Sequence, residues 1–354
     1  GPITGVGRAF VTALSAYAAT HRDDCVLLLP HGADDPAIPG VRTAAAPRGA
    51  LRRQLHLPKL LRTLGAALLH SSVAAVPLRA PCPTIATAHD LPWWHPELGE
   101  RPGRWRRFAT RRALQAADLV LVPSAATARD VRRELQAPRA RIVVVPHATA
   151  IGPAPDDAAL MARSGPFLVL GDDRPRKNRA RLVAAWERAS MVRPQLPALQ
   201  FVGPPHAYVA EAEKAVRVRT CRALVHVSLF EGFGLPVLEG LANGAPVLCS
   251  DLPPHREIAG EHALFVDPTD VEAIAEGGLY GDIADHRSKV RWRPLQIAAW
   301  FPHRVVIAPP DAPLIGSGCH AANFHACGGF ACLQHTLQLR TYVASKWRRQ
   351  DFFY

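Results

Sequence analysis

Lysine, long apolar runs and regular metal-binding motifs are all scarce in this chain of 354 residues. Five lysines contribute to the 42 basic residues, and arginine supplies the rest. No apolar run reaches the roughly 18 residues of a membrane-spanning helix, so the sequence predicts no transmembrane span. The chain starts at Gly1 without a signal-peptide pattern. We therefore expect a cytoplasmic protein, with any membrane association peripheral and at the inner face.

The seven cysteines form no regular spacing. Four of them stand singly in or beside apolar runs, as reduced cysteines of a cytosolic protein do; they are Cys25, Cys82, Cys221 and Cys249. The other three lie among histidines between residues 319 and 335. Their side-chain types could ligate zinc, but the spacing fits no zinc finger. The sequence therefore predicts no metal site.

The formal net charge of +12 suits anionic partners, which include nucleotides, membrane surfaces and nucleic acid. No aromatic-rich RNA motif or zinc-finger spacing accompanies this charge in residues 1–280, so we expect no nucleic acid partner. A solvated basic surface is the simpler explanation of the charge. A basic nucleic-acid-binding protein remains an alternative.

Short apolar runs alternate with helical stretches along most of the chain, which predicts an α/β fold with parallel sheets covered on both faces. The predicted strands are 26–29, 84–88, 119–122, 142–145, 167–170, 199–202, 223–230, 246–250 and 263–266. The predicted helices are 9–20, 104–117, 124–136 with Ser124 as its N-cap, and 178–190. The length allows two domains, each with its own core.

We predict a first Rossmann-like domain at 1–150, a linker at 151–165 rich in glycine, proline and aspartate, and a second domain at 166–280. The tail at 281–354 keeps no steady helix or strand period and has no assigned fold. Two doubly wound domains in series face each other across a cleft at the carboxyl ends of their strands, where ligands bind in such sheets.

Two carboxylates eight residues apart, Glu231 and Glu239, flank a glycine-bracketed turn. Pro236 suits the first turn of the helix that follows. The order of strand, glycine loop and helix offers backbone N–H groups and a positive dipole end to an anion. One phosphate-bearing, polyhydroxylated ligand could touch both carboxylates. An ordinary turn with two solvated carboxylates is the alternative.

A second motif, at 171–178, also follows a strand and precedes a helix. Arg176 and Lys177 would project there at the cleft, where they could neutralise a diphosphate and stabilise it as it departs. A basic loop with Asn178 as a helix cap is the structural alternative. Pairing this motif with the Glu231–Glu239 loop in the same domain favours the functional interpretation.

The first domain offers two weaker signals. Gly5 and Gly7 form a glycine turn ahead of a helix, which would let a ligand approach the backbone closely. His89 follows the strand at 84–88, so its imidazole could hydrogen-bond a sugar hydroxyl or a developing charge. A simple turn and a structural histidine are the alternatives for these two signals.

Taken together, these pieces resemble the retaining glycosyltransferases of family 4, which have the GT-B fold of two Rossmann domains. The resemblance covers most of residues 1–280. It rests on motifs in the family's order: Gly-Val-Gly-Arg at 5–8, His89-Asp90-Leu91, Val122-Pro123-Ser124, Pro175-Arg176-Lys177-Asn178 and the segment 231–239. The glutamate-paired loop and the Arg-Lys-Asn element are the specific ones.

The resemblance implies transfer of a hexose, with mannose a candidate, from a nucleotide-diphosphate sugar to a glycan or lipid-linked acceptor. It implies no metal and no cofactor beyond the donor. The residues implied in donor binding are Gly5, Gly7, Arg176, Lys177, Gly232, Phe233, Gly234, Leu235 and Glu239. Those implied in catalysis are His89 and Glu231. No carboxylate is obviously placed for a covalent double displacement, so we expect front-side attack.

Three departures from the family pattern stand out. The strand that normally precedes the glycine turn has no counterpart, because the turn begins at residue 1. The run at 202–209 joins elements that normally flank a further helix and strand. After residue 280 the sequence looks unrelated to the family. A nucleotide-binding remnant without activity is therefore a further alternative.

Overall fold

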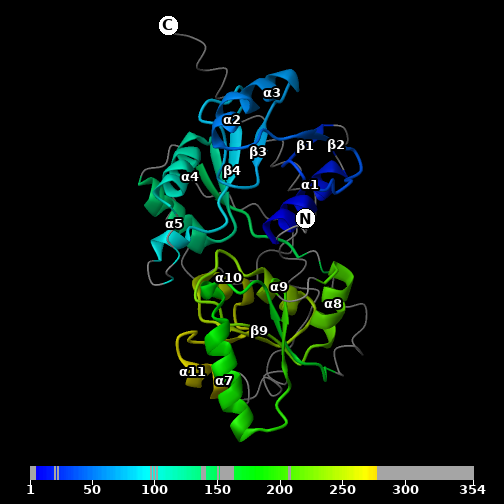
Figure 1. Cartoon of the computed structure of the whole chain (residues 1–354), viewed down its shortest axis with the longest axis vertical. Coiled ribbons are helices and arrows are strands. Elements are labelled where there is room, and N and C mark those ends of the chain that lie inside the picture. Colours follow the sequence, from blue (N-terminus) through cyan, green and yellow to red (C-terminus); the bar gives the residue numbers. More distant parts are fainter. Residues whose placement is uncertain are drawn as a thin grey trace, which may run out of the picture.

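The computed structural model describes residues 5–276 with internal gaps at 20, 22–23, 96–97, 99, 101–102, 137–140, 150, 152–162 and 206–208, and without the side chains of residues 5, 6, 8 and 9. The described residues form two α/β units, drawn one above the other in Figure 1. The predicted tail at 281–354 and most of the predicted linker at 151–165 lie outside the described residues.

The first unit contains a parallel sheet in the order β3 (Leu69–Ser71), β4 (Thr84–Thr87), β5 (Leu119–Val122) and β6 (Arg141–Val144). A separate parallel pair joins β1 (Cys25–Leu29) to β2 (Val41–Ala45). The helices are α1 (Gly5–Ala18), α2 (Ala50–Leu55), α3 (Leu57–Thr63), the short 3₁₀ turn η1 (Pro92–Trp94), α4 (Arg104–Ala116) and α5 (Ala125–Leu135). Side chains of α4 and α5 pack on the sheet in one apolar cluster that includes Leu114, Val120 and Val131.

The second unit is a five-stranded parallel sheet in the order β11 (Leu264–Val266), β10 (Val247–Ser250), β9 (Ala223–His226), β7 (Phe167–Leu170) and β8 (Leu199–Val202). Its helices are η3 (Pro175–Lys177), α7 (Arg179–Val192), α8 (Glu211–Thr220), α9 (Leu235–Ala242), α10 (Pro253–Ala259) and α11 (Val271–Ala273). In the described residues, α8 is the helix that links edge strand β8 to β9.

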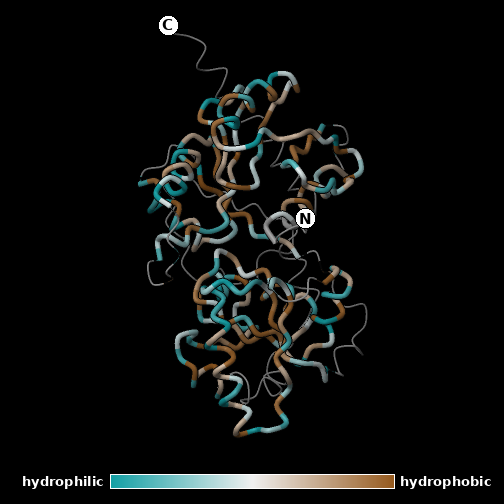
Figure 2. The backbone as a smooth tube through the Cα atoms, in the orientation of Figure 1, coloured by the Kyte–Doolittle hydropathy of each residue, from teal (hydrophilic) through white to brown (hydrophobic). Residues whose placement is uncertain are grey.

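Alternate residues of the buried strands face opposite helical layers, as a doubly covered sheet requires. Leu168 and Leu170 pack with α8, α9 and α10, whereas Phe167 and Val169 pack with α7 and α11. Figure 2 shows the resulting apolar segments running through the middle of each unit. The predicted α/β class with parallel sheets is confirmed.

Two of the predicted boundaries are wrong. The strand predicted at 223–230 ends at His226, because residues 227–234 form the loop that carries Glu231. The helix predicted at 9–20 begins at Gly5, so Gly5 and Gly7 form its first turn and not a turn ahead of it. Ser124 caps α5 as predicted, since its Oγ accepts a hydrogen bond of 3.0 Å from the Thr127 N–H.

Candidate functional site

The strand order of the second unit brings the two motifs together. The chain leaves β7 towards β8 on one side, and β9 lies on the other side of β7, so the order reverses between β7 and β9. Loops at the carboxyl ends of such neighbouring strands diverge and leave a crevice. The loop after β7 carries Arg176 and Lys177, and the loop after β9 carries Glu231. The predicted pairing of these motifs is therefore present in the tertiary structure.

Lys177 and Glu231 form an ion pair with 2.6 Å between Nζ and Oε1. His226, at the end of β9, places its Nε2 at 2.9 Å from the same oxygen. Burial alone would raise the pKa of Glu231, but Lys177, His226 and Arg176 hold it well below its usual range. Glu231 is thus a fixed anion, able to accept hydrogen bonds from hydroxyl groups.

The sequence did not identify His226, which looks like an ordinary residue of an apolar strand. Its side chain is buried, and burial lowers the pKa of its imidazole despite the hydrogen bond to Glu231. The signal that could have revealed it is position, because the last residue of a parallel strand borders the ligand crevice.

Arg176 connects the two units. Its Nη1 donates to Asp90 Oδ2 over 2.7 Å, and its Nε lies 3.4 Å from Glu100 Oε1. Burial would lower the pKa of this guanidinium, but Asp90, Glu231 and Glu100 outweigh that effect and raise it. Arg176 is therefore a buried cation shared between both sides of the cleft, and a diphosphate would have to compete with Asp90 and Glu100 for it.

Gly232, in the loop between β9 and α9, contacts the first unit directly. Its carbonyl oxygen accepts hydrogen bonds from Ser124 Oγ at 2.6 Å and Thr127 Oγ1 at 2.9 Å. Its Cα lies against the carbonyl oxygen of His89, so closely that a Cβ there would overlap with it. Only glycine fits this position, and the loop is consequently positioned by the opposite unit.

Both ring nitrogens of His89 are engaged within the first unit. Nε2 lies 2.8 Å from the carbonyl oxygen of Ser72, which can only accept, so Nε2 carries a proton. Nδ1 lies 3.2 Å from His147 Nε2, which must then be the donor, because burial lowers the pKa of both rings and keeps them neutral. The predicted contact of the His89 ring with a sugar would require one of these bonds to break, and the role stays a prediction.

Gly234 has φ +110°, a conformation that side-chain-bearing residues rarely adopt, and it opens α9 as the N-cap. α9 begins at Leu235, and Pro236 lies in its first turn, as predicted. Phe233 is buried in the apolar core of the second unit and also meets the His147 ring edge-on at 5.2 Å. The backbone from 232 to 235 is therefore fixed from both sides.

Behind Gly234 lies His255, a completely buried imidazole on α10. Its Nδ1 donates to the Ser250 carbonyl at 2.9 Å, and its Nε2 has no hydrogen-bond partner among the described residues. Burial, with a smaller effect of His226, lowers the pKa of His255 to about 4. The ring is neutral at pH 7 and must gain a proton as the chain unfolds in acid.

We predict that this histidine makes the second unit acid-sensitive. Between pH 6.5 and 4 the unfolded chain binds one more proton at His255 than the folded chain does, so the free energy of unfolding falls as the pH falls, by up to about 3 kcal/mol. Thermal unfolding midpoints between pH 7 and 4.5 should fall less steeply for His255→Gln than for the wild type. An exposed control, His31→Gln, should keep the wild-type slope, and a His255→Gln slope equal to it would refute the prediction.

Glu239 lies in the second turn of α9 and is buried. Its Oε1 accepts from Lys214 Nζ at 2.7 Å, and the same ammonium lies 2.9 Å from the more exposed Glu211. The sequence missed Lys214, because it stands in a charged helix that looks solvated. A donor molecule bound at Glu239, as predicted, would share this carboxylate with the lysine.

Removing one partner of this pair should cost more than removing both. Lys214→Met leaves a buried carboxylate uncompensated, which we expect to lower the free energy of unfolding by about 3 kcal/mol. The double variant Lys214→Met/Glu239→Leu should recover most of that loss, and Glu211→Gln should change the stability less than Lys214→Met does, because the Glu211 side chain keeps 41% of its surface exposed. Urea denaturation of these three variants, of Glu239→Leu and of the wild type measures this cycle, and a double variant whose loss equals the sum of the losses of its two single variants would contradict it.

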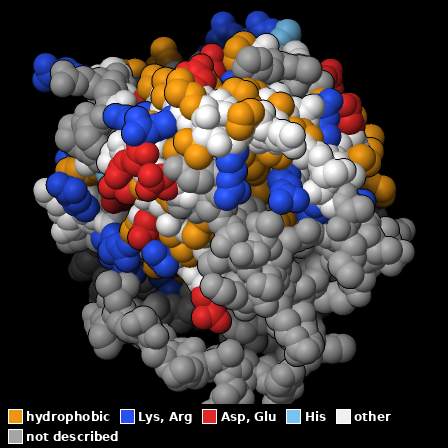
Figure 3. Space-filling model, turned by 90° about the horizontal axis from the view of Figure 1, so that it is seen from below, with side chains coloured by type: hydrophobic (Ala, Val, Ile, Leu, Met, Phe, Trp, Pro, Cys, Tyr) orange, Lys and Arg blue, Asp and Glu red, His pale blue; other side chains and the backbone are white. Residues whose placement is uncertain are grey.

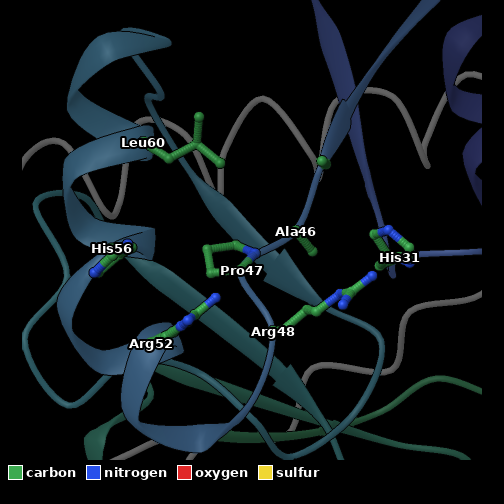
Figure 4. A pocket seen from close by; sticks show the side chains of 8 residues that line it. His31, Ala46, Pro47, Arg48, Arg52, His56 and Leu60 are labelled. Atoms are coloured by element: carbon green, nitrogen blue, oxygen red, sulfur yellow. The ribbon is translucent and has the colours of Figure 1, made fainter.

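A separate hollow lies in the first unit beside α2 and α3, with a volume of about 530 Å³ (Figure 4). Its lining includes Arg48, Arg52, His31 and His56 and no carboxylate. Arg48 extends towards His31 in Figure 4. None of the predicted site residues lines this hollow, so it is distinct from the site of Lys177 and Glu231.

The described residues contain no group of three or more histidine, cysteine or acidic side chains arranged to hold a metal ion. Within the described part of the chain, Cys25, Cys82, Cys221 and Cys249 form no disulfide bond, as expected of reduced cysteines. No described helix combines the length and the hydropathy of a bilayer-spanning segment. The tail cysteines lie outside the described residues.

Two family models match the chain, and together they cover more than half of it. Glycosyltransferase Family 4 matches residues 4–150, and glycosyl transferases group 1 matches residues 206–278. The curated relatives include the O-antigen chain mannosyltransferase B of Escherichia coli, 27% identical over 54% of this chain and 59% of that protein. The O-antigen chain mannosyltransferase RfbU of Salmonella typhimurium is 46% identical over 14% of each chain. The chain thus spans less than two thirds of the length of these relatives.

Solved structures show the same two-unit arrangement at low sequence identity. The sucrose-phosphate synthase of Thermosynechococcus elongatus has a TM-score of 0.65 at 20% identity, over 84% of this chain and 90% of that one. HepE of Anabaena, solved in complex with UDP and glucose, has a TM-score of 0.57 at 16% identity, over 85% of this chain and 95% of that one. The predicted fold of two Rossmann-like domains is therefore confirmed.

Proposed function

Because this chain belongs to glycosyltransferase family 4 and has the GT-B fold, we propose that it transfers a hexose from a nucleotide-diphosphate sugar to a glycan or lipid-linked acceptor, with retention of configuration. The observation that carries the proposal is the Lys177–Glu231 pair at the reversal point of the strand order. The pair offers a cation for the diphosphate and, beside it, a fixed carboxylate for the sugar hydroxyls.

In this proposal Lys177 binds the diphosphate and stabilises the charge that develops when the bond to the sugar breaks. Arg176 adds a second cation if the diphosphate replaces one of its two carboxylate partners. Glu231 accepts hydrogen bonds from the sugar hydroxyls, and the backbone of Phe233–Leu235 lies alongside the sugar and phosphate. Glu239, shared with Lys214, is the candidate contact for the ribose.

Front-side attack remains our proposed route to retention. The two carboxylates nearest the two cations are already committed, Glu231 to Lys177 and His226, and Asp90 to Arg176. A carboxylate held by cations is a weak nucleophile, so a covalent glycosyl-enzyme is disfavoured. Mass spectrometry of the enzyme quenched during turnover would contradict this route by showing a glycosylated Glu231 or Asp90.

Mannose is the proposed sugar, because the curated relatives are mannosyltransferases of O-antigen chains. Incubation of the full chain with labelled GDP-mannose, UDP-glucose and related donors tests this, with nucleotide release and transfer to a glycan extract as readouts. GDP-mannose should give the highest rate. A lack of release and transfer with every donor would refute the activity, and calorimetric binding of GDP or UDP in that case would identify a nucleotide-binding remnant.

A further inference from the structure

We propose that His226 is a positioning residue for Glu231: its ring holds one oxygen of the carboxylate, so that the other oxygen is presented to the hydroxyl groups of the donor sugar. His226 is the last residue of β9, and Glu231 lies in the loop that follows. The inference rests on the proposed function, because it assigns His226 to the site at which the sugar is bound. His226 lies outside both motifs that the sequence predicts.

The two oxygens of the Glu231 carboxylate have different surroundings. Oε1 accepts a hydrogen bond from Lys177 Nζ at 2.6 Å and lies 2.9 Å from His226 Nε2. Within the described part of the chain, Oε2 has no hydrogen-bond partner. The Glu231 side chain keeps 10% of its surface exposed, so the carboxylate is not sealed from solvent. Oε2 is therefore the oxygen left to accept hydrogen bonds from a ligand.

The imidazole of His226 is a neutral donor. Its side chain is 2% exposed, and burial lowers its pKa despite the hydrogen bond to Glu231. A carboxylate can only accept, so the single proton of the neutral ring is on Nε2 and is directed at Oε1. Ser228 Oγ is a more distant neighbour, 3.4 Å from the same nitrogen. A ring fixed in the core thus sets the orientation of the carboxylate, which a lysine on a flexible stem does not do alone.

The loops on either side of this cluster are joined to each other through their backbone. The Leu229 N–H donates to the Arg176 carbonyl at 2.7 Å, and the Asn178 side chain donates to the Val227 carbonyl at 3.0 Å. Neither bond involves the imidazole. Replacing the ring should therefore act on the orientation of the carboxylate and leave the path of the loop in place.

Ion pairs on the outside of the second domain differ from this cluster. Arg188 stands next to Glu272 there, and Arg256 next to Asp251. Figure 3, which views the molecule from below, shows basic and acidic side chains close together on the coloured part of that face. Such exposed pairs are screened by solvent and contribute little. The three side chains that meet at Oε1 are at most 13% exposed, so their hydrogen bonds have a defined geometry, as functional sites require.

Donor binding and transfer by variants of His226 test the proposal. The donor is whichever of GDP-mannose and UDP-glucose gives the higher rate with the wild type. His226→Leu removes the N–H and should raise KM for this donor roughly tenfold, the effect of losing one hydrogen bond. Calorimetric affinity for the corresponding nucleoside diphosphate should stay within about twofold of the wild type, because this ligand lacks the sugar. His226→Gln keeps an N–H donor near the position of Nε2 and should restore the wild-type KM.

The pH dependence of KM is a second readout that a purely structural role would not change. Burial raises the pKa of Glu231, whereas Lys177 and the hydrogen bond from His226 lower it below its usual range. His226→Leu removes that hydrogen bond and raises the pKa. As the pH is lowered, KM should begin to rise at a higher pH in His226→Leu than in the wild type. His226→Gln should keep the wild-type profile.

Val225→Ala is the structural control. Val225 precedes His226 on β9, is completely buried and packs in the apolar cluster with α7, so its truncation should destabilise the fold. KM for the donor should stay at the wild-type value, because Val225 makes no hydrogen bond to Glu231. His226→Met fills the space of the ring with an adaptable apolar side chain and should behave as His226→Leu does, so the test does not depend on the folding of one variant.

The outcomes separate this inference from the proposed function. A wild type that neither transfers nor binds a sugar from either donor overturns the proposed function and this inference with it. If the wild type transfers, the inference alone is overturned by apolar variants of His226 that keep the wild-type KM and pH profile. It is also overturned if these variants lose affinity for the nucleoside diphosphate as much as for the donor.

Discussion

Lys177→Ala is expected to lower kcat for sugar transfer by roughly 10²- to 10³-fold, the effect of removing one preorganised charge at a reacting centre. The lysine is the nearest cation to Glu231 and the predicted partner of the leaving diphosphate. KM for the donor should rise as well, because the ground-state diphosphate also loses this contact. Steady-state rates with the preferred donor measure both effects.

The pH profile of the same variant separates an electrostatic role from a structural one. In the wild type, Lys177 and its neighbours hold the pKa of Glu231 well below its usual range. Without Lys177 the largest effect that lowers the pKa of Glu231 is lost, so this pKa rises. As the pH is lowered, the residual activity should therefore begin to fall at a higher pH than in the wild type. Lys59→Ala, on the exposed surface of α3, is the control and should leave rate and profile unchanged. Activity of Lys177→Ala within threefold of the wild type would disprove the assignment.

Gly232→Ala is expected to reduce transfer by at least 10²-fold, since a misplacement of about 1 Å at a reacting centre has that effect. The added Cβ would overlap with the carbonyl oxygen of His89, and backbone on both sides of the cleft would have to move. This movement would also weaken the hydrogen bonds that Ser124 and Thr127 donate to the Gly232 carbonyl.

Hydrogen exchange provides a second readout that does not depend on catalysis. The amide of Thr127, which now donates to Ser124 Oγ, should exchange faster in Gly232→Ala if the loop orders the start of α5. Gly103→Ala is the matched control, because no atom lies within 4 Å of its added Cβ. If Gly232→Ala keeps the wild-type exchange rate at Thr127 and the wild-type activity, the close contact at Gly232 is not needed for either, and the prediction is wrong.

Glu257 supplies a further link across the same cleft. Its carboxylate accepts from the Ala125 and Ala126 N–H groups at 2.7 and 3.0 Å, at the start of α5. An anion at a helix N-terminus is stabilised by the orphan amides and the dipole. The start of α5 therefore contacts the second domain in two ways: Ser124 donates to the Gly232 carbonyl, and two backbone N–H groups donate to Glu257. These bonds join two units that have separate apolar cores.

Local sequence determined the strands and helices whose signal is strong. The buried runs at 119–122 and 167–170 are continuous and apolar, and α5 has a capping serine with clear amphipathic spacing, so their boundaries agree with the structure. β2 and β3 were not predicted, because β2 mixes exposed polar residues with alanine and β3 has only three residues. Such short segments become strands through pairing with a neighbour, which no local pattern reveals.

Motif spacing also placed Arg176, Lys177 and Glu231 at one sheet edge, because loops that follow parallel strands meet at their carboxyl ends. What the side chains do there was decided by the tertiary structure alone. Asp90, from the other domain and 86 positions away in the sequence, forms an ion pair with Arg176. His147 forms a hydrogen bond with the ring of His89. Local sequence patterns determine the strand or loop that carries a side chain. The ion-pair partner of that side chain depends on which distant segment packs against it in the folded chain. Burial then sets its pKa.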